Sequence, residues 1–164
     1  MIQNKNTQDA QKSPFGEFRG LSTAIILAGG LGTRLRSAVP DLPKCMAPVA
    51  GKPFIAHVID FCIEEGVTNF ILSLGYKSEV IINYVSFQYP QLNVDYAIEE
   101  EPLGTGGGIQ LACRKSKETS VLVLNGDTLF RVNLPQLSYF HFSNNAECTL
   151  ALKSMTDFNR YGVV

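Results

Sequence analysis

Apolar residues along the chain form two kinds of pattern, short continuous runs and runs repeated at helical spacing. Short apolar segments predict strands at residues 24–28, 70–74, 94–98, 121–124 and 148–152, and the continuous run at 24–28 predicts a strand covered on both faces. Helical spacing predicts helices over residues 54–65 and 79–89, and two more near 108–115 and 135–144. Strands that alternate with helices indicate an α/β fold of Rossmann-like type, a three-layer sandwich with a mixed, mostly parallel sheet and helices on both faces. In such sheets ligands bind at the carboxyl ends of the strands.

The chain divides into a tail and a single domain. Residues 1–20 are polar and offer almost nothing to bury, which predicts a flexible tail ahead of a domain at 21–164. The 14 basic and 15 acidic side chains leave a net charge of −1, which gives no electrostatic case for nucleic acid as a partner. No apolar run approaches the roughly 20 residues that cross a bilayer, and no early segment has the pattern of a signal peptide. The four widely spaced cysteines are typical of buried thiols in a reducing compartment, so we expect a cytoplasmic protein.

The first segment with a chemical character is Gly29–Leu35, directly after the first predicted strand. Its glycines allow backbone N–H groups to approach a phosphate, and Arg34 adds a permanent planar cation. The spacing is neither that of a Walker A loop nor that of a dinucleotide-binding loop, since Leu35 stands where the latter requires its last glycine. On glycine content alone, a plain turn is an equal alternative. Lys44, a second cation on the same Gly/Pro-rich connection, favours a polyphosphate ligand.

Two further segments follow the third and fourth predicted strands. Glu99–Gly108 combines three consecutive acids with four glycines in its last five positions. The glycines would let a flat ring or a sugar lie against the backbone, and a solvated acidic loop is the alternative. Asp127 closes the sequence Asn125-Gly126-Asp127, where a carboxylate suits Mg²⁺. The alternative for Asp127 is a cap on the next turn.

Four segments together resemble the motifs of the sugar-nucleotide pyrophosphorylases, a family of nucleotidyltransferases. They are Gly29–Leu35, Pro43–Lys44, Leu103–Gly106 and Asn125–Asp127, and the resemblance extends over residues 23–164. Within that family, the segments Arg34–Val49, Leu74–Lys77 and Asp95–Glu99 are most similar to the guanylyltransferases of D-glycero-D-manno-heptose 1-phosphate. The nucleotidyltransferases of mannose 1-phosphate and glucose 1-phosphate share the loops and remain alternatives.

The resemblance implies an enzyme that transfers a nucleoside monophosphate from a nucleoside triphosphate, GTP, to a sugar 1-phosphate, with Mg²⁺ as cofactor. Arg34, Lys44 and Asp127 would be catalytic, and Asp127 would hold the metal. The implied nucleotide-binding residues are Leu27, Ala28, Gly29, Gly30, Gly32, Thr33, Arg34, Lys44, Glu99 and Gly104. The implied sugar-binding residues are Thr105, Gly106, Asn125, Tyr161 and Gly162. A homo-oligomer is left open.

The same resemblance implies that residues 160–164 begin the sugar-binding part of the domain. Family members continue from there with a Glu-Lys-Pro segment and a second metal-binding Asp. We therefore expect a C-terminally truncated domain, in which residues 21–164 supply the nucleotide-binding part. A nucleotide-binding module without catalysis is an alternative function. A structural α/β adaptor is a third, but it would leave Arg34, Lys44 and Asp127 unexplained.

Overall fold

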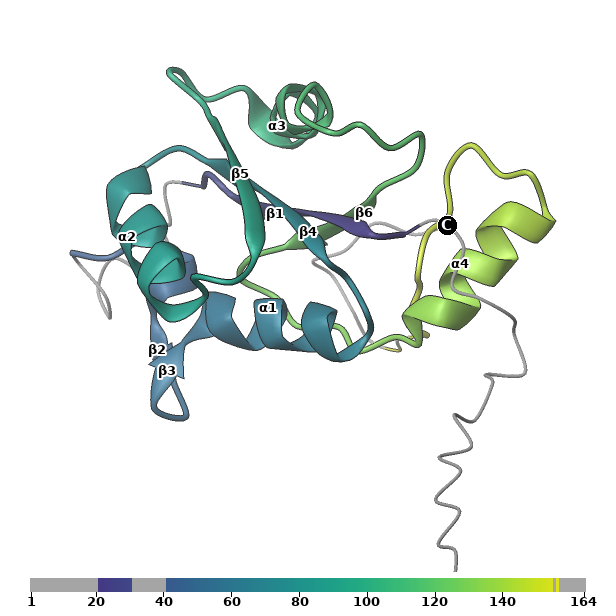
Figure 1. Ribbon diagram of the computed structural model, residues 1–164, viewed down its shortest axis with the longest axis horizontal. Helices are drawn as coiled ribbons and strands as arrows, with labels where there is room; N and C mark the ends of the chain where they lie inside the picture. The colour runs from purple at the N-terminus through teal and green to yellow at the C-terminus, as the bar shows by residue number, and fades with distance from the viewer. Residues whose placement is uncertain (1–20, 31–40, 155, 157–164) are drawn as a thin grey trace, which may run out of the picture.

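A four-stranded parallel sheet forms the centre of the protein (Figure 1). The computed structural model describes residues 21–30, 41–154 and 156. The strands are β1 (Thr23–Ala28), β4 (Asn69–Leu74), β5 (Asn93–Ile98) and β6 (Leu122–Asn125), and they lie in the order β5-β4-β1-β6. The strand order therefore reverses beside β1, and in open parallel sheets this is the place where ligands bind at the carboxyl edge.

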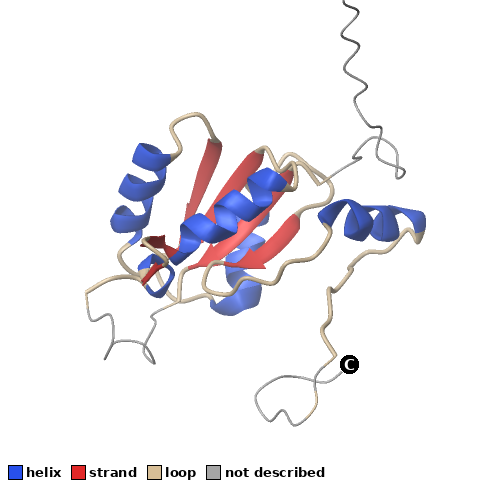
Figure 2. Cartoon of the chain, turned by 90° about the horizontal axis from the view of Figure 1, so that it is seen from below, coloured by secondary structure: helices blue, strands red, loops and turns tan. Residues whose placement is uncertain are grey.

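Helices cover both faces of the sheet. The helices α1 (Phe54–Glu64) and α2 (Ser78–Gln88) pack on one face, and α3 (Gly104–Cys113) packs on the other (Figure 1, Figure 2). Alternate side chains of β1 supply the two cores, because neighbouring residues of a strand point to opposite faces. Ala24 and Ile26 belong to the larger core on the α1 side, and Ile25 belongs to the smaller core on the α3 side. This burial on both faces explains the uninterrupted apolar run of β1.

Smaller elements connect the sheet to its helices. Between β1 and α1 the chain forms a 3₁₀ turn, η2 (Lys44–Met46), and an antiparallel hairpin of β2 (Pro48–Val49) and β3 (Lys52–Pro53) that the sequence pattern did not predict. After β6 comes α4 (Leu134–Ser143). Its N-cap is Asn133, whose side-chain oxygen accepts a hydrogen bond of 2.7 Å from the Gln136 N–H group. Leu134 anchors this helix in the larger core.

The fifth predicted strand, at residues 148–152, is wrong. These residues form no strand in the structure, and Leu150 and Leu152 are each 64% exposed. A strand needs main-chain partners, and among the described residues β6 pairs with β1 alone, so the sheet ends there. An apolar pattern alone therefore does not make a strand here, because residues 148–152 pair with none of the described strands, the open edge of β6 included.

The glycine-rich segment before α3 also differs from its prediction. The helix begins at Gly104 and not near Gly108, so the glycines form its first turns, and the loop before it is confined to residues 99–103. Glycine disfavours helix by about 1 kcal/mol relative to alanine. Packing outweighs this preference here, because α3 presses against the sheet through Ala112 and Gly108, both of which are buried. The 1–20 tail lies outside the described residues, and among those described no helix is long and apolar enough to cross a membrane.

Candidate active site

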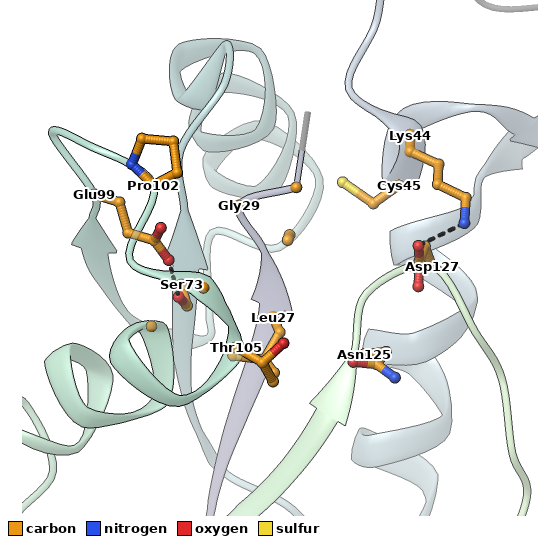
Figure 3. Close-up of a pocket in the computed structure, with 14 residues that line it drawn as sticks. Leu27, Gly29, Lys44, Cys45, Ser73, Glu99, Pro102, Thr105, Asn125 and Asp127 are labelled. Carbon is orange, nitrogen blue, oxygen red and sulfur yellow. Dashed lines mark hydrogen bonds and ion pairs between the residues drawn. The ribbon is translucent and has the colours of Figure 1, made fainter. Parts of the chain in front are cut away.

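A cavity of about 580 Å³ opens at the carboxyl ends of the four parallel strands (Figure 3). Its walls come from the ends of the strands, from η2 and from the first turns of α3. The lining residues are Leu27, Ala28, Gly29, Gly30, Lys44, Cys45, Ser73, Glu99, Pro102, Gly104, Thr105, Gly108, Asn125 and Asp127. The cavity thus lies where the strand order predicts a ligand site.

One side of the cavity carries an ion pair between Lys44 and Asp127. The Lys44 Nζ atom lies 2.7 Å from the Asp127 Oδ2 atom, and the Thr128 hydroxyl donates a hydrogen bond of 3.2 Å to the other carboxylate oxygen. The two side chains are 38% and 35% exposed, so water screens their attraction and the pair adds little to stability. Both groups are accessible from the cavity and can exchange partners when an anion or a cation binds.

The backbone around Lys44 is held by η2. The Met46 N–H group donates to the Pro43 carbonyl at 2.8 Å, and the Ala47 N–H group donates to the Lys44 carbonyl at 3.1 Å. Pro43, Cys45 and Met46 are buried, so three anchors surround a lysine whose own side chain reaches into the cavity. This arrangement presents a single cation from a fixed piece of backbone.

Cys45, next to Lys44, also lines the cavity. Burial is the main cause that raises the pKa of its thiol to about 12; a backbone hydrogen bond lowers the pKa in part, and the negative charge of Asp127 adds a smaller rise. The thiolate is therefore not populated near neutral pH, and Cys45 is no nucleophile there. All four cysteines are free, but the expectation of buried thiols holds only for Cys45 and Cys62, because Cys113 and Cys148 are exposed.

Glu99 stands on the other side of the cavity from the ion pair (Figure 3). Its Oε1 atom accepts a hydrogen bond of 3.4 Å from the Ser73 hydroxyl, and its Oε2 atom accepts one of 3.1 Å from the Leu103 N–H group. Glu100 and Glu101 are exposed and do not line the cavity. The solvated-loop alternative therefore holds for these two residues and not for Glu99.

Two glycines make the space that the Glu99 carboxylate occupies. A Cβ atom on Gly108 would lie 2.6 Å from Oε1 of Glu99 and 3.0 Å from Oγ of Ser73. A Cβ atom on Gly29 would lie 3.2 Å from the same Oε1 atom. The first distance is far below van der Waals contact, so residue 108 must lack a side chain for Glu99 to keep this position.

Ten of the sequence-predicted site residues line this one cavity: Leu27, Ala28, Gly29, Gly30, Lys44, Glu99, Gly104, Thr105, Asn125 and Asp127. Gly106 is exposed on α3 and is not among the lining residues. The predicted residues Gly32, Thr33, Arg34, Tyr161 and Gly162 lie outside the described part of the chain. Sequence reasoning missed Cys45, Ser73, Pro102 and Gly108 as lining residues. Ser73 could have been found as a polar residue inside an apolar run. Gly108 could have been found as the last glycine of the Gly104–Gly108 cluster.

A family model described as Nucleotidyl transferase matches residues 23–164. The chain therefore belongs to the nucleotidyltransferase family, and its α/β fold with a parallel sheet agrees with that assignment. It is 50% identical over 141 residues to the D-glycero-alpha-D-manno-heptose 1-phosphate guanylyltransferase of Aneurinibacillus thermoaerophilus, covering 86% of this chain and 61% of that relative. The protein of the same name from Campylobacter jejuni is 45% identical, with 86% and 62% covered.

A solved structure is similar to this chain in both fold and sequence. The crystal structure of HddC from Yersinia pseudotuberculosis complexed with GMP-PN matches with a TM-score of 0.67 and 42% identity, over 73% of this chain and 53% of that one. The chain spans about three fifths of the length of the two curated relatives named above.

Proposed function

We propose that this chain is the nucleotide-binding part of a sugar 1-phosphate guanylyltransferase, which joins GTP and a sugar 1-phosphate to give a GDP-sugar and pyrophosphate. One observation carries the proposal. A cation and carboxylate pair, Lys44 and Asp127, faces Glu99 across a single cavity at the strand ends. Lys44 and Asp127 could bind the phosphates of a nucleotide and their metal ion, and Glu99 could bind its base. A nucleotide would therefore extend across the cavity from the ion pair to Glu99. The two most identical relatives described above carry guanylyltransferase names.

The reaction needs charge neutralisation more than proton transfer. An oxygen of the sugar phosphate attacks the α-phosphorus in line, the new O–P bond forms, and the bond to the leaving pyrophosphate breaks. Because the nucleophile is already an anion, no general base is required. Lys44 would offset the charge that builds at the α-phosphate, and Arg34 with the N–H groups of the Gly29–Leu35 loop would hold the β- and γ-phosphates.

Asp127 is the residue that would hold Mg²⁺. Its carboxylate is a hard oxygen ligand, 35% exposed, at the cavity wall. Mg²⁺ commonly takes only one or two carboxylates from a protein and fills its other positions with phosphate oxygens and water. A lone carboxylate therefore fits, and no cluster of three or more His, Cys, Asp or Glu residues occurs in the part of the chain that the structure describes. The ion would neutralise the phosphates and help to orient them.

Glu99 is the proposed reader of the base. A carboxylate only accepts hydrogen bonds, and guanine offers two adjacent donors, N1–H and the 2-amino group. Uracil and thymine offer one ring N–H between two carbonyl oxygens, so the second carboxylate oxygen would be repelled. The Ser73 and Leu103 contacts leave lone pairs on both Glu99 oxygens, because each oxygen can accept more than one hydrogen bond.

The proposed sugar is D-glycero-D-manno-heptose 1-phosphate, with Thr105 and Asn125 at the cavity wall as described candidates for its contacts. Mannose 1-phosphate is the first alternative, since a mannose-1-phosphate guanylyltransferase from Mycobacterium tuberculosis is 39% identical to this chain. Glucose 1-phosphate is the second. A cytoplasmic location, where the four thiols would stay reduced, is part of the same proposal.

Calorimetric titration of the chain with Mg²⁺ and each of GTP, UTP, dTTP, CTP and ATP tests the nucleotide half of the proposal. We expect GTP to bind at least about tenfold more tightly than the others, a difference of about 1.4 kcal/mol. Pyrophosphate release with the three sugar 1-phosphates tests the reaction. GTP binding without pyrophosphate release would favour the alternative of a nucleotide-binding module, and equal affinity for all five triphosphates would contradict the guanylyl proposal.

A further inference from the structure

Lys77 has a backbone conformation that its residue type disfavours. It is the N-cap of α2, with φ 52° and ψ 43°, in the left-handed region that favours glycine or asparagine. Helix N-caps also favour Ser, Thr, Asp or Asn, and the N-terminal end of a helix repels a cation. The Lys77 side chain caps nothing in α2. Neither local backbone preference nor helix capping therefore explains a lysine at this position.

The ammonium group of Lys77 has its contact elsewhere. Its Nζ atom donates a hydrogen bond of 2.7 Å to the Asp41 carbonyl oxygen, and it lies 5.4 Å from the centroid of the Tyr76 ring. Asp41 stands three residues before Lys44, on the segment that carries Lys44 to the cavity. A side chain from the β4–α2 connection therefore contacts the segment that carries Lys44.

The two ends of the Lys44 segment are held differently. From Pro43 onwards the anchors are burial and the backbone hydrogen bonds of η2. Asp41 and Leu42, just before, are exposed, so packing contributes little there. The contact from Lys77 supplies a polar anchor at this exposed end. A charge-assisted hydrogen bond of this length is of the stronger kind.

From this geometry we infer that Lys77 is a positioning residue for Lys44. It holds the exposed end of the Asp41–Met46 segment so that the Lys44 ammonium group stays at the cavity wall, 2.7 Å from Asp127, where it can meet a triphosphate. Lys77 does not line the cavity and would touch no ligand there. The ordering of the Lys44 segment follows from the Lys77–Asp41 contact, and its effect on GTP binding rests on the proposed function.

Substitution of Lys77 in the full chain tests both parts. Lys77→Asn removes the ammonium group but suits the left-handed N-cap, so we expect the melting temperature to stay the same or rise. Lys77→Arg keeps a cationic donor and should restore the contact. Lys115→Asn, which removes an exposed lysine at the end of α3, is the matched control for lost charge.

Hydrogen exchange in the absence of nucleotide measures the cause. In Lys77→Asn, the Met46 and Ala47 amides, which donate to the Pro43 and Lys44 carbonyls, should exchange about tenfold faster than in the unchanged chain. Lys115→Asn should leave these rates unchanged. Unchanged rates in Lys77→Asn would overturn the inference, whether or not the protein binds GTP.

A double-mutant cycle with Lys44→Ala measures the consequence. Lys77→Asn should weaken GTP binding about tenfold when Lys44 is present, and less than about twofold in the Lys44→Ala background. Equal losses in both backgrounds would overturn the inference, because Lys77 would then act on the ligand without Lys44. If the unchanged chain binds no GTP at all, the proposed function fails, and the exchange rates still decide whether Lys77 orders the Lys44 segment.

Discussion

The Lys44 ammonium group and the Asp127 carboxylate lie 2.7 Å apart at the cavity wall, so each neutralises the charge of the other. A triphosphate with its Mg²⁺ offers each of them a new partner, phosphate oxygens for Lys44 and the metal for Asp127. The ion pair would therefore be exchanged for two other ionic contacts. This exchange keeps charge balanced at both stages and makes separate predictions for the two residues.

Asp127→Asn should remove the metal contact and leave the fold intact, since the side chain is partly exposed and the amide is of the same size. We expect turnover, measured as pyrophosphate release, to fall by about 100-fold or more, and Mg²⁺ to lose most of its effect on GTP affinity. Asp95→Asn, on the exposed side of β5, is the matched control for a lost carboxylate. Turnover of Asp127→Asn within a few-fold of the original would remove Asp127 from the metal site.

The two cations should give different kinetic losses. Arg34→Ala should mainly raise the KM for GTP, because its proposed contacts are with phosphates that are bound in the ground state as well. Lys44→Ala should mainly lower kcat, because charge at the α-phosphate grows in the transition state. Steady-state kinetics of both variants under identical Mg²⁺ concentrations make the comparison. The same pattern of loss in both would show that the roles are divided wrongly.

The Glu99 pocket predicts opposite effects for two glycines of one helix. Alanine at position 108 would place its Cβ atom 2.6 Å from the Glu99 Oε1 atom, whereas alanine at position 106 meets nothing within 4 Å. Gly106→Ala should therefore stabilise the fold by up to about 1 kcal/mol, from helix propensity alone. Gly108→Ala should destabilise it by about 1–3 kcal/mol and displace Glu99, so GTP binding should weaken as well. Chemical denaturation measures the first effect and calorimetry the second. A Gly108→Ala protein as stable as Gly106→Ala would contradict the crowding.

An element of this fold was predictable from the sequence where its own residues determine it, and not where contacts with distant residues do. The strands around Ile25 and Ile71 were predictable, because burial on both faces leaves a continuous apolar run. The strand around Leu124 was predictable from the same kind of run, although Val123 is 39% exposed. The start of α3 was not, because its glycines are poor helix formers and only packing against the sheet makes them helical. The fifth strand failed for a similar reason, since pairing depends on a partner strand and not on the segment itself.

The candidate site shows the same limit. Lys44 and Asp127 were each predictable from residue type and position, but their contact follows from strand order, which places the end of β6 beside the end of β1. Ser73 was hidden because a single small polar residue inside an apolar run is common in a buried strand. Glu99 could not be separated from Glu100 in the sequence, since only the direction of its side chain makes it a cavity residue.

Two buried thiols predict a loss of stability at alkaline pH. Burial raises the pKa of Cys45 and Cys62 from 9.0 to about 12, and the charge of Glu65 adds to the effect on Cys62. In the unfolded chain both thiols lose their protons near the ordinary value, so above it the unfolded state binds fewer protons than the folded one. Their contribution to stability is therefore complete below about pH 9 and is lost as the pH rises towards about 12.

Urea denaturation at intervals from pH 8 to pH 10.5 measures this slope, at about 1.4 kcal/mol per thiol and pH unit at most. Cys62→Ala should be less stable than the original at pH 8, because it leaves a cavity, and should lose less stability per pH unit. Cys113→Ala, an exposed thiol, should keep the original slope. If Cys62→Ala keeps the original slope as well, the buried thiol does not titrate in this range.

The choice of base should depend on Glu99 and not on its acidic neighbours. The Glu99 carboxylate lies in the cavity with oxygens that can accept from guanine N1–H and the 2-amino group, and Glu101 is exposed outside it. Glu99→Gln replaces one acceptor by a donor, which would oppose the 2-amino group or N1–H, so GTP binding should weaken by about 10- to 100-fold. Binding of UTP and dTTP should change little or improve, because the ring carbonyls can accept from the new amide. Glu101→Gln removes the same charge from the same loop and should leave the order of the five triphosphates unchanged. A preference for GTP that survives Glu99→Gln would remove Glu99 from base recognition, and a preference of the unchanged chain for dTTP or CTP would overturn the guanylyl assignment itself.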